Sequence, residues 1–312
     1  MLKTLKKIGG PALIIIAALL WAFDGVIRRF LYALPPITII SFEHLIGLVI
    51  LAPFAWKAAI KTRLGKKEWF LVALIAVLSG LLGTLWFTTA LLKTNYISFS
   101  VVFLLQKLQP LFAIGSAAIF LHEKMHKRYI TWAALALVSA YFVTFPNGLV
   151  NFATGEGTVI AALYALGAAF AWGTSTTFSK MLLNKISSQA STFFRFLITV
   201  IVAFPFIFIS GNSSSIGIIT PSQIGLFALI AVSTGMVAIL IYYKGLSKVS
   251  VHVSTILELT FPFVAILIDM VMYHNFLTWP QWIASILLVG SIYEIARLRE
   301  KGSMDGSPEI SS

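Results

Sequence analysis

The sequence contains no cysteine, so disulfide bonds, thiol nucleophiles and thiolate metal sites are all excluded. It also carries little charge: Asp, Glu, Lys and Arg together make up 11% of the residues, whereas hydrophobic residues make up 59%. A soluble domain of this composition would expose too much apolar surface to water. A helix bundle embedded in lipid has no such difficulty, so the composition indicates a polytopic membrane protein in contact with the lipid bilayer.

Phosphate-binding motifs are missing as well. The sequence has no Gly-rich nucleotide loop, which excludes ATP-driven transport by this chain, and it has no Ser nucleophile elbow.

The net charge of +12 does not indicate nucleic-acid binding, because Lys and Arg gather in alternate loops between apolar segments. The opposite loops hold only Arg28, Arg29 and Lys93. This bias predicts that the N-terminus and the C-terminus are both cytoplasmic in a multi-pass protein of the cell membrane.

Ten apolar segments are each long enough to cross the bilayer, which takes about 20 helical residues. They cover residues 11–34, 37–56, 69–92, 97–121, 129–145, 157–181, 189–210, 221–243, 252–273 and 279–296. Residues 1–10 form a basic cytoplasmic N-terminus, and residues 298–312 are expected to be a disordered cytoplasmic tail. The predicted fold class is therefore all-α, with ten transmembrane helices.

The chain repeats itself in two halves, residues 11–146 and 157–297. Gln106 and Pro110 in the fourth segment match Glu258 and Pro262 in the ninth, with the same spacing between them. Each half has five segments, an odd number, so the second half must cross the membrane upside down relative to the first. Such inverted repeats are typical of secondary transporters, whose substrate site lies near the midplane between the halves.

These motifs carry a resemblance to a known family. A Trp in the first segment of each half, an Ala-Leu-x-Lys turn at residues 90–93, the mid-segment Pro110 and Pro262, and Leu121-His122-Glu123-Lys124 resemble the drug/metabolite transporter superfamily, in its EamA-type ten-helix branch. The resemblance implies a secondary transporter that moves a small organic metabolite or amphipathic compound by alternating access. An exporter with proton coupling is one form of this function.

Ionisable residues inside apolar segments are candidates for the substrate site, because each is costly in lipid. Asp24 and Arg28 are four residues apart, so they either form an ion pair along one helix or line a cavity. Counted along the helix axis, Arg28 and Asp269 lie near the outer interface. We expect these two side chains to reach solvent as ordinary helix ends.

Glu43 and His44 lie deeper in the second segment, roughly 10 Å from its outer end. Glu43 either faces the substrate cavity or pairs with a neighbour such as Arg28. His44 and Arg195 occupy equivalent positions in the two halves. If both face the pseudo-two-fold axis, they lie on opposite sides of the midplane, as residues of two gates would.

Lys107 is the leading candidate, because it lies about 15 Å from the outer end of its segment, too deep to reach solvent easily. Gln106 adds polar capacity beside it. Lys107 either holds an anionic group of the substrate or acts as a structural counter-ion to Asp24 or Glu258. Glu258 is also the natural candidate for a protonatable or cation-facing group.

Two further patterns allow other interpretations. Trp21 and Trp172 either line an apolar pocket or simply pack between helices. His122-Glu123-Lys124-Met125-His126 fits the His-Glu-x-x-His signature of zinc metalloproteases, which makes an intramembrane protease the enzymatic alternative. Zinc catalysis also needs a third ligand and an open coordination position. The motif falls in a short basic turn without an obvious third ligand, so we expect no metal, no cofactor and no enzymatic activity.

Overall fold

The computed structural model describes residues 8–92, 108–144, 147–149, 158–273 and 277–304. Within this part of the chain every regular element is a helix. Five stretches are long and apolar enough to cross a membrane: Gly10–Arg28, Pro36–Lys61, Lys66–Ala90, Ser188–Ile209 and Pro221–Leu246. The prediction of an all-α membrane protein with several apolar spans is confirmed.

The first half contains the elements α2 (Gly10–Ala22), α3 (Asp24–Arg28), η1 (Arg29–Leu31), α4 (Pro36–Lys61), α5 (Lys66–Ile75), the π-helix η2 (Ala76–Gly83), α6 (Thr84–Leu92), α8 (Gln109–Phe120) and α9 (Lys127–Thr144). The second half contains α10 (Thr158–Leu183), α11 (Ser188–Ile209), α12 (Ser214–Gly217), α13 (Pro221–Val232), α14 (Met236–Leu246), α15 (Val251–Leu257), α16 (Thr260–Tyr273) and α17 (Trp279–Met304). Apart from η1 and α12, which lie in connections or at segment ends, these helices fall within or extend the predicted apolar segments.

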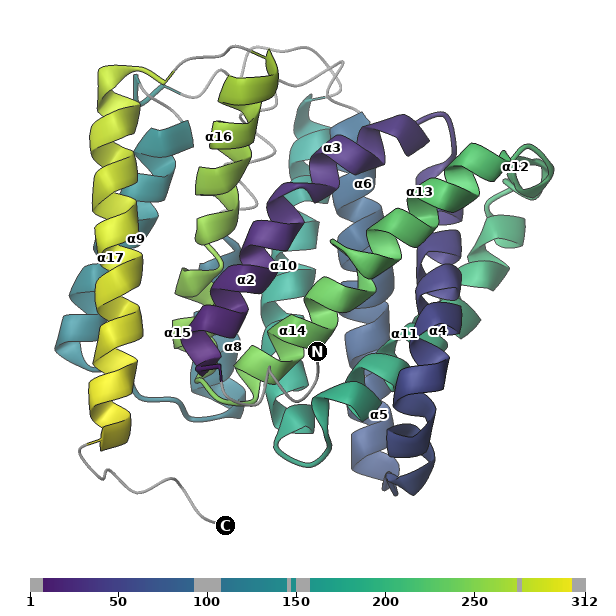
Figure 1. The fold of residues 1–312 in the computed structure, drawn as a ribbon, viewed down its shortest axis with the longest axis horizontal. Coiled ribbons are helices and arrows are strands. Elements are labelled where there is room, and N and C mark those ends of the chain that lie inside the picture. The colour runs from purple at the N-terminus through teal and green to yellow at the C-terminus, as the bar shows by residue number, and fades with distance from the viewer. Residues whose placement is uncertain (1–7, 93–107, 145–146, 150–157, 274–276, 305–312) are drawn as a thin grey trace.

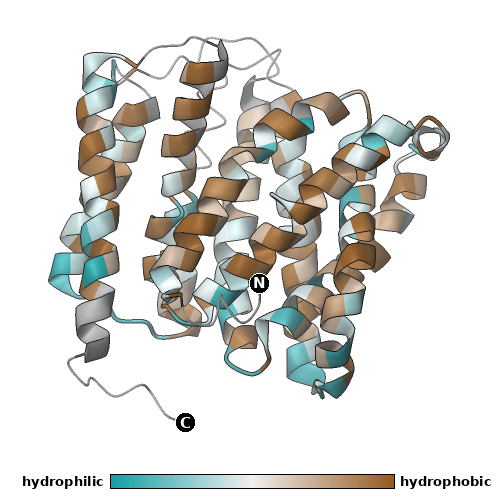
Figure 2. Ribbon diagram, viewed as in Figure 1, coloured by the Kyte–Doolittle hydropathy of each residue, from teal (hydrophilic) through white to brown (hydrophobic). Residues whose placement is uncertain are grey.

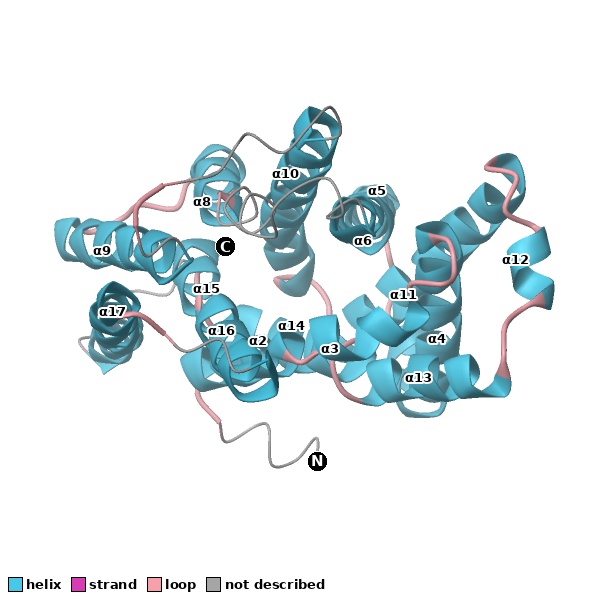
Figure 3. Ribbon diagram, turned by 90° about the horizontal axis from the view of Figure 1, so that it is seen from above, coloured by secondary structure: helices cyan, strands magenta, loops and turns pink. Residues whose placement is uncertain are grey.

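Helix packing follows the repeat. Helix α4 packs against its counterpart α11, and α9 packs against its counterpart α17. The first span of each half packs against the third span of the other, so α2 contacts α14 while α10 contacts α5, η2 and α6. Seen from above, α8, α10 and α6 form one row and α16, α2 and α14 form the opposite row, with α9–α17 and α4–α11 at the two ends (Figure 3). Each row therefore combines helices from both halves.

The start of the first described helix and the end of the last described helix lie on one face of the bundle. Helix α2 begins and α17 ends at the lower end of the molecule in Figure 1. Hydrophilic residues are most frequent at this same end, whereas hydrophobic residues dominate the middle of the helices (Figure 2). The loops that join α4 to α5, α8 to α9, and α10 to α11 supply much of this polar surface.

Several segments that were expected to be continuous helices are interrupted. The first breaks at Phe23, between α2 and α3, and the eighth breaks at Ser233–Gly235. The ninth breaks at Glu258 and Leu259, between α15 and α16. Pro262 has no backbone N–H to donate to the carbonyl of Glu258, which favours an interruption of the helix at this point. Broken helices inside a bundle bring polar backbone and side chains to its interior, where neighbouring helices can satisfy them.

Candidate functional site

Glu258 lies at the centre of a polar cluster where the two rows of helices meet. Its Oε1 atom accepts hydrogen bonds from the hydroxyls of Tyr242 at 2.6 Å and Ser254 at 3.2 Å. Its Oε2 atom accepts a hydrogen bond from Nε2 of Gln109 at 3.1 Å. The Tyr242 hydroxyl also lies 3.4 Å from the hydroxyl of Thr176 on α10. The cluster therefore joins α8 and α10 of one row to α14 of the other through the break in the ninth span.

The backbone places Gln109 beside Glu258. Helix α8 begins at Gln109, with Pro110 in its first turn, where the missing N–H of proline costs nothing. On the other side, Gly173 of α10 lies directly against this first turn. A Cβ atom at Gly173 would come within 2.6 Å of the Gln109 carbonyl oxygen. Glycine at this position is therefore required for the close approach that carries Gln109 into the cluster.

Trp21 adds an aromatic surface to the cluster. Its ring lies 5.1 Å from the ring of Tyr242, tilted by 53°. Trp21, Gln109 and Glu258 are all partly accessible, although they lie on helices in the middle of the bundle. Sequence reasoning singled out Trp21 and Glu258 but not Tyr242, whose hydroxyl in an otherwise apolar segment was the only available signal.

A second cluster joins Asp24, Arg28 and Glu43. Arg28 donates from Nε to Oδ2 of Asp24 at 2.8 Å and from Nη1 to Oε2 of Glu43 at 2.9 Å. The hydroxyl of Thr234, in the break of the eighth span, donates to Oδ1 of Asp24 at 2.6 Å. The predicted pairs of Arg28 with Asp24 and with Glu43 are thus both present.

The expectation that Arg28 reaches solvent was wrong, because only 5% of its side chain is exposed. The depth estimate assumed one straight helix. The break at Phe23 starts the new helix α3, and Arg28 at its end turns toward α4 instead of the membrane surface. The side chain of Asp269, for which the same expectation was made, lies outside the described residues.

A third group surrounds Arg195 on α11. Its Nη1 atom donates to the hydroxyl of Tyr243 at 3.1 Å, and that hydroxyl also contacts Ser179 of α10 at 3.0 Å. His44 lies on α4 and packs against the neighbour of Arg195 in sequence, with its ring 4.8 Å from the ring of Phe196 and its Nδ1 atom 2.9 Å from the Ile40 carbonyl oxygen. His44 and Arg195 therefore both lie at the α4–α11 contact between the halves.

The remaining candidates lie elsewhere. Trp172 donates from its indole nitrogen to the carbonyl oxygen of Ser79 in η2, at 3.3 Å, and its ring packs 5.2 Å from that of Phe87. Gln106 and Lys107 lie outside the described residues.

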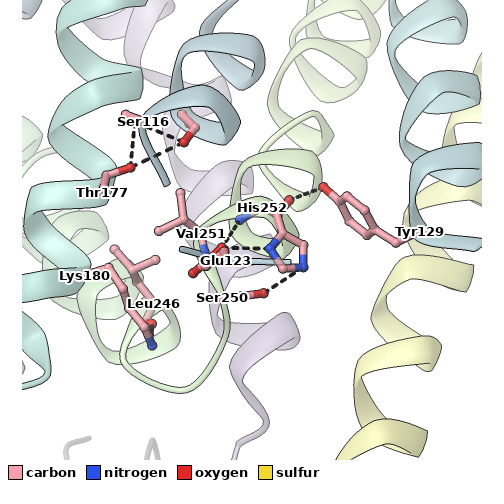
Figure 4. A network of polar contacts seen from close by, with 10 residues as sticks. Ser116, Glu123, Tyr129, Thr177, Lys180, Leu246, Ser250, Val251 and His252 are labelled. Carbon is pink, nitrogen blue, oxygen red and sulfur yellow. Dashed lines mark hydrogen bonds and ion pairs between the residues drawn. The ribbon is translucent and has the colours of Figure 1, made fainter. Parts of the chain in front are cut away.

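Glu123, from the zinc-like motif, binds the start of α15 (Figure 4). Its carboxylate accepts hydrogen bonds from the backbone N–H groups of Val251 at 2.9 Å and His252 at 3.2 Å, and its Oε2 atom lies 2.7 Å from Nδ1 of His252. Tyr129 donates from its hydroxyl to the carbonyl oxygen of His252. Burial alone would raise the pKa of Glu123, but the hydrogen bonds from His252 and Val251 outweigh it and hold the pKa below its ordinary value.

This geometry does not fit a metalloprotease. Residues 121–126 form a non-helical connection between α8 and α9, so His122 and His126 do not share a helical face. Across the described part of the chain, no group of three or more His, Cys, Asp or Glu residues is placed to hold a metal ion. Glu123 instead ties the α8–α9 connection of the first half to α15 of the second.

Comparison with known proteins agrees with this architecture. The model of the EamA-like transporter family matches residues 8–145 and 159–297, once in each half. Riboflavin transporter ImpX of Fusobacterium nucleatum subsp. nucleatum (strain ATCC 23726 / VPI 4351) is 34% identical over 296 residues, which cover 94% of this chain and 99% of that protein. A crystal structure that is 18% identical has a TM-score of 0.74, covers 94% of this chain and 98% of its own, and is similar in fold. The chain therefore belongs to the EamA-like transporter family within the drug/metabolite transporter superfamily, and it is a multi-pass secondary transporter, not an enzyme.

Proposed function

We propose that this protein transports riboflavin or a closely related flavin across the cell membrane by alternating access between its two halves. The 34% identity to a riboflavin transporter over nearly the whole of both chains carries this proposal. The chemistry of the Glu258 cluster supports it. A flavin is a flat tricyclic ring with a polar pyrimidine-dione edge and a chain of hydroxyl groups, so its site needs aromatic faces together with a few well-placed polar groups.

We place the substrate at the cluster of Trp21, Gln109, Tyr242 and Glu258. Trp21 on α2 and Tyr242 on α14 offer aromatic surface. Gln109, on α8 of the opposite row, and Glu258, at the break between α15 and α16, offer hydrogen-bonding groups. Gln106 and Lys107 come just before Gln109 in the chain and are proposed to contribute to the same site. A ligand held between the rows would contact both halves, as alternating access requires.

The other candidate residues are proposed to hold the halves together around this site. Asp24 and Glu43 both pair with Arg28 within the first half, and Asp24 also accepts a hydrogen bond from Thr234 of the second half. His44 and Arg195 both lie on helices of the α4–α11 contact between the halves. The indole N–H of Trp172 donates its hydrogen bond to the carbonyl oxygen of Ser79 in η2. Their effect on transport is expected to come through the stability and movement of the halves.

Glu258 is proposed to couple transport to protons. The described part of the chain gives this carboxylate hydrogen-bond donors but no Lys or Arg within 4 Å. Among the described residues, the charged form of Glu258 is therefore stabilised by neutral hydrogen-bond donors, which a bound substrate or a helix movement can displace. A carboxylate in this situation gains or loses a proton as the transporter changes state.

The cytoplasmic face is proposed to be the end of the bundle that carries the starts of α5 and α9 and the ends of α4 and α17. Lys61, Lys66, Lys127 and Arg297 all lie at this end. Positive residues of short loops are retained on the cytoplasmic side, so both chain ends are assigned to the cytoplasm.

Counterflow in proteoliposomes tests the proposal. Vesicles loaded with unlabelled riboflavin are expected to accumulate labelled riboflavin only when they contain the protein, and excess unlabelled riboflavin outside should compete. Absence of counterflow by folded protein would contradict the proposed substrate. An imposed pH gradient should change the accumulation by the wild type, whereas the counterflow that remains in Glu258→Gln should no longer respond to the gradient. A wild type that ignores the gradient would contradict proton coupling alone.

A further inference from the structure

The carboxamide of Gln109 has an orientation fixed by its partner. When the Glu258 carboxylate is ionised, it only accepts hydrogen bonds, so in this state the NH2 group of Gln109, and not its oxygen, faces Oε2 of Glu258. The other oxygen of Glu258 accepts a short hydrogen bond from Tyr242 at 2.6 Å, which holds the carboxylate in place, and a longer one from Ser254 at 3.2 Å. Ionised Glu258 therefore positions Gln109, and in this state the amide cannot turn over without losing this contact.

This orientation leaves half of the carboxamide available. Among the described residues, no donor reaches the Oε1 atom of Gln109, and only one of its two N–H groups is used. The side chain is partly accessible, as are those of Trp21 and Glu258. Gln109 thus presents a carbonyl oxygen next to an N–H group, close to the aromatic surface of Trp21 and Tyr242.

A carbonyl oxygen next to an N–H group is the complement of an imide edge. In a flavin, N3–H lies between two carbonyl groups on the pyrimidine-dione ring. The Oε1 atom of Gln109 can accept from N3–H while its free N–H donates to the neighbouring carbonyl. Such paired contacts fix both the identity and the orientation of a ring edge, because an analogue without the N–H leaves a polar group of the site unsatisfied.

We infer that Gln109 is the specificity-determining residue of the transporter and reads the imide edge of its substrate, with Glu258 as the positioning residue. This inference rests on the proposed flavin transport and deepens it. The ligand class is a planar heterocycle with an imide N–H, and the group that Gln109 discriminates against is a substituent on that nitrogen.

N3-methylriboflavin tests this inference, because it keeps the ring system and the hydroxyl chain but lacks the N3–H donor. Dissociation constants of riboflavin and of N3-methylriboflavin are measured on purified protein for the wild type, Gln109→Met and Ser254→Ala. Methionine matches the length of glutamine without its polar groups. Ser254→Ala is the matched control, since it removes a different hydrogen bond to the same Glu258 carboxylate.

The wild type is expected to bind N3-methylriboflavin more weakly than riboflavin by roughly tenfold, the effect of one lost hydrogen bond together with the crowding methyl group. Gln109→Met should reduce this ratio to near one, whereas Ser254→Ala should keep it. A wild type that does not distinguish the two ligands would overturn the inference even if the variant folds poorly. An unchanged ratio in Gln109→Met would do the same. A wild type that binds neither ligand would instead overturn the proposed function on which the inference rests.

Discussion

Removal of Arg28 is the most informative single perturbation of the helix bundle. The side chain of this residue is 5% exposed and neutralises two carboxylates, on α3 and on α4. Arg28→Met keeps most of the apolar stem but removes the charge and all five donors. The substitution leaves Glu43, whose side chain is 8% exposed, without a counter-ion inside the membrane span.

The expected cost can be bounded. Breaking a buried ion pair by removing one partner typically costs about 3–5 kcal/mol. Glu43 can escape its unpaired charge by binding a proton, which limits the cost to the gap between the solution pH and the ordinary glutamate pKa of about 4.3. At about 1.36 kcal/mol per pH unit, that limit is about 3.7 kcal/mol at pH 7 and about 1 kcal/mol at pH 5. Arg28→Met should therefore be strongly destabilised at pH 7 and much less so at pH 5.

The assay is unfolding of purified protein in detergent, followed by tryptophan fluorescence at both pH values. The double variant Arg28→Met/Glu43→Gln should recover most of the loss at pH 7, because the buried charge is gone. Arg297→Met is the matched control: Arg297 is 50% exposed and pairs with Glu294 at 3.2 Å, so its loss should cost less than about 1 kcal/mol. Wild-type stability of Arg28→Met at pH 7, or additive losses in the double variant, would refute this account of the Arg28 cluster.

Three further predictions concern the ends of the bundle. Glu123→Gln should lower stability by about 2 kcal/mol at pH 7, since it removes charge-assisted hydrogen bonds to the start of α15. The pKa of Glu123 is lowered in the folded protein, so the stabilising contribution of its carboxylate is complete above the ordinary glutamate pKa of about 4.3. The contribution is lost as the pH falls through the lower pKa of the folded state, where the variant and the wild type should converge. Purified protein should contain no stoichiometric zinc by elemental analysis, and His126→Ala should transport normally; zinc that is bound by the wild type and lost in this variant would restore the enzymatic alternative. In the cysteine-free background, Lys127→Cys should react with impermeant thiol reagents from the cytoplasm and Ser214→Cys from outside, and the reverse pattern would contradict the assigned orientation.

Much of the fold could be predicted because lipid imposes simple rules on sequence. The length of the apolar runs predicted the helical segments. The equal spacing of Gln106 and Pro110 in the first half and of Glu258 and Pro262 in the second predicted the division into two halves. The helix breaks at Phe23 and at residues 233–235 were missed, because hydropathy does not change where a helix is interrupted inside a bundle.

The site could be predicted only in part, and the reason is again the breaks. Glu258 and Trp21 were found as a buried acid and a repeated aromatic, but their contact through Tyr242 depends on how α14 folds back onto α15. The depth of Arg28 was misjudged because it was counted along a single helix axis. Periodicity reports the face of one helix, whereas the partner on another helix is set by tertiary packing.

The most direct test of the proposed substrate site is riboflavin binding to Trp21→Ala, measured by quenching of flavin fluorescence in purified protein. Trp282, 41% exposed on α17, provides the control variant Trp282→Ala. The wild type and Trp282→Ala should bind riboflavin equally. Trp21→Ala should bind it more weakly by about 1–3 kcal/mol, the usual value of stacking a heterocyclic base on an aromatic side chain. Wild-type affinity in Trp21→Ala, or no riboflavin binding by any of the three folded proteins, would contradict the site.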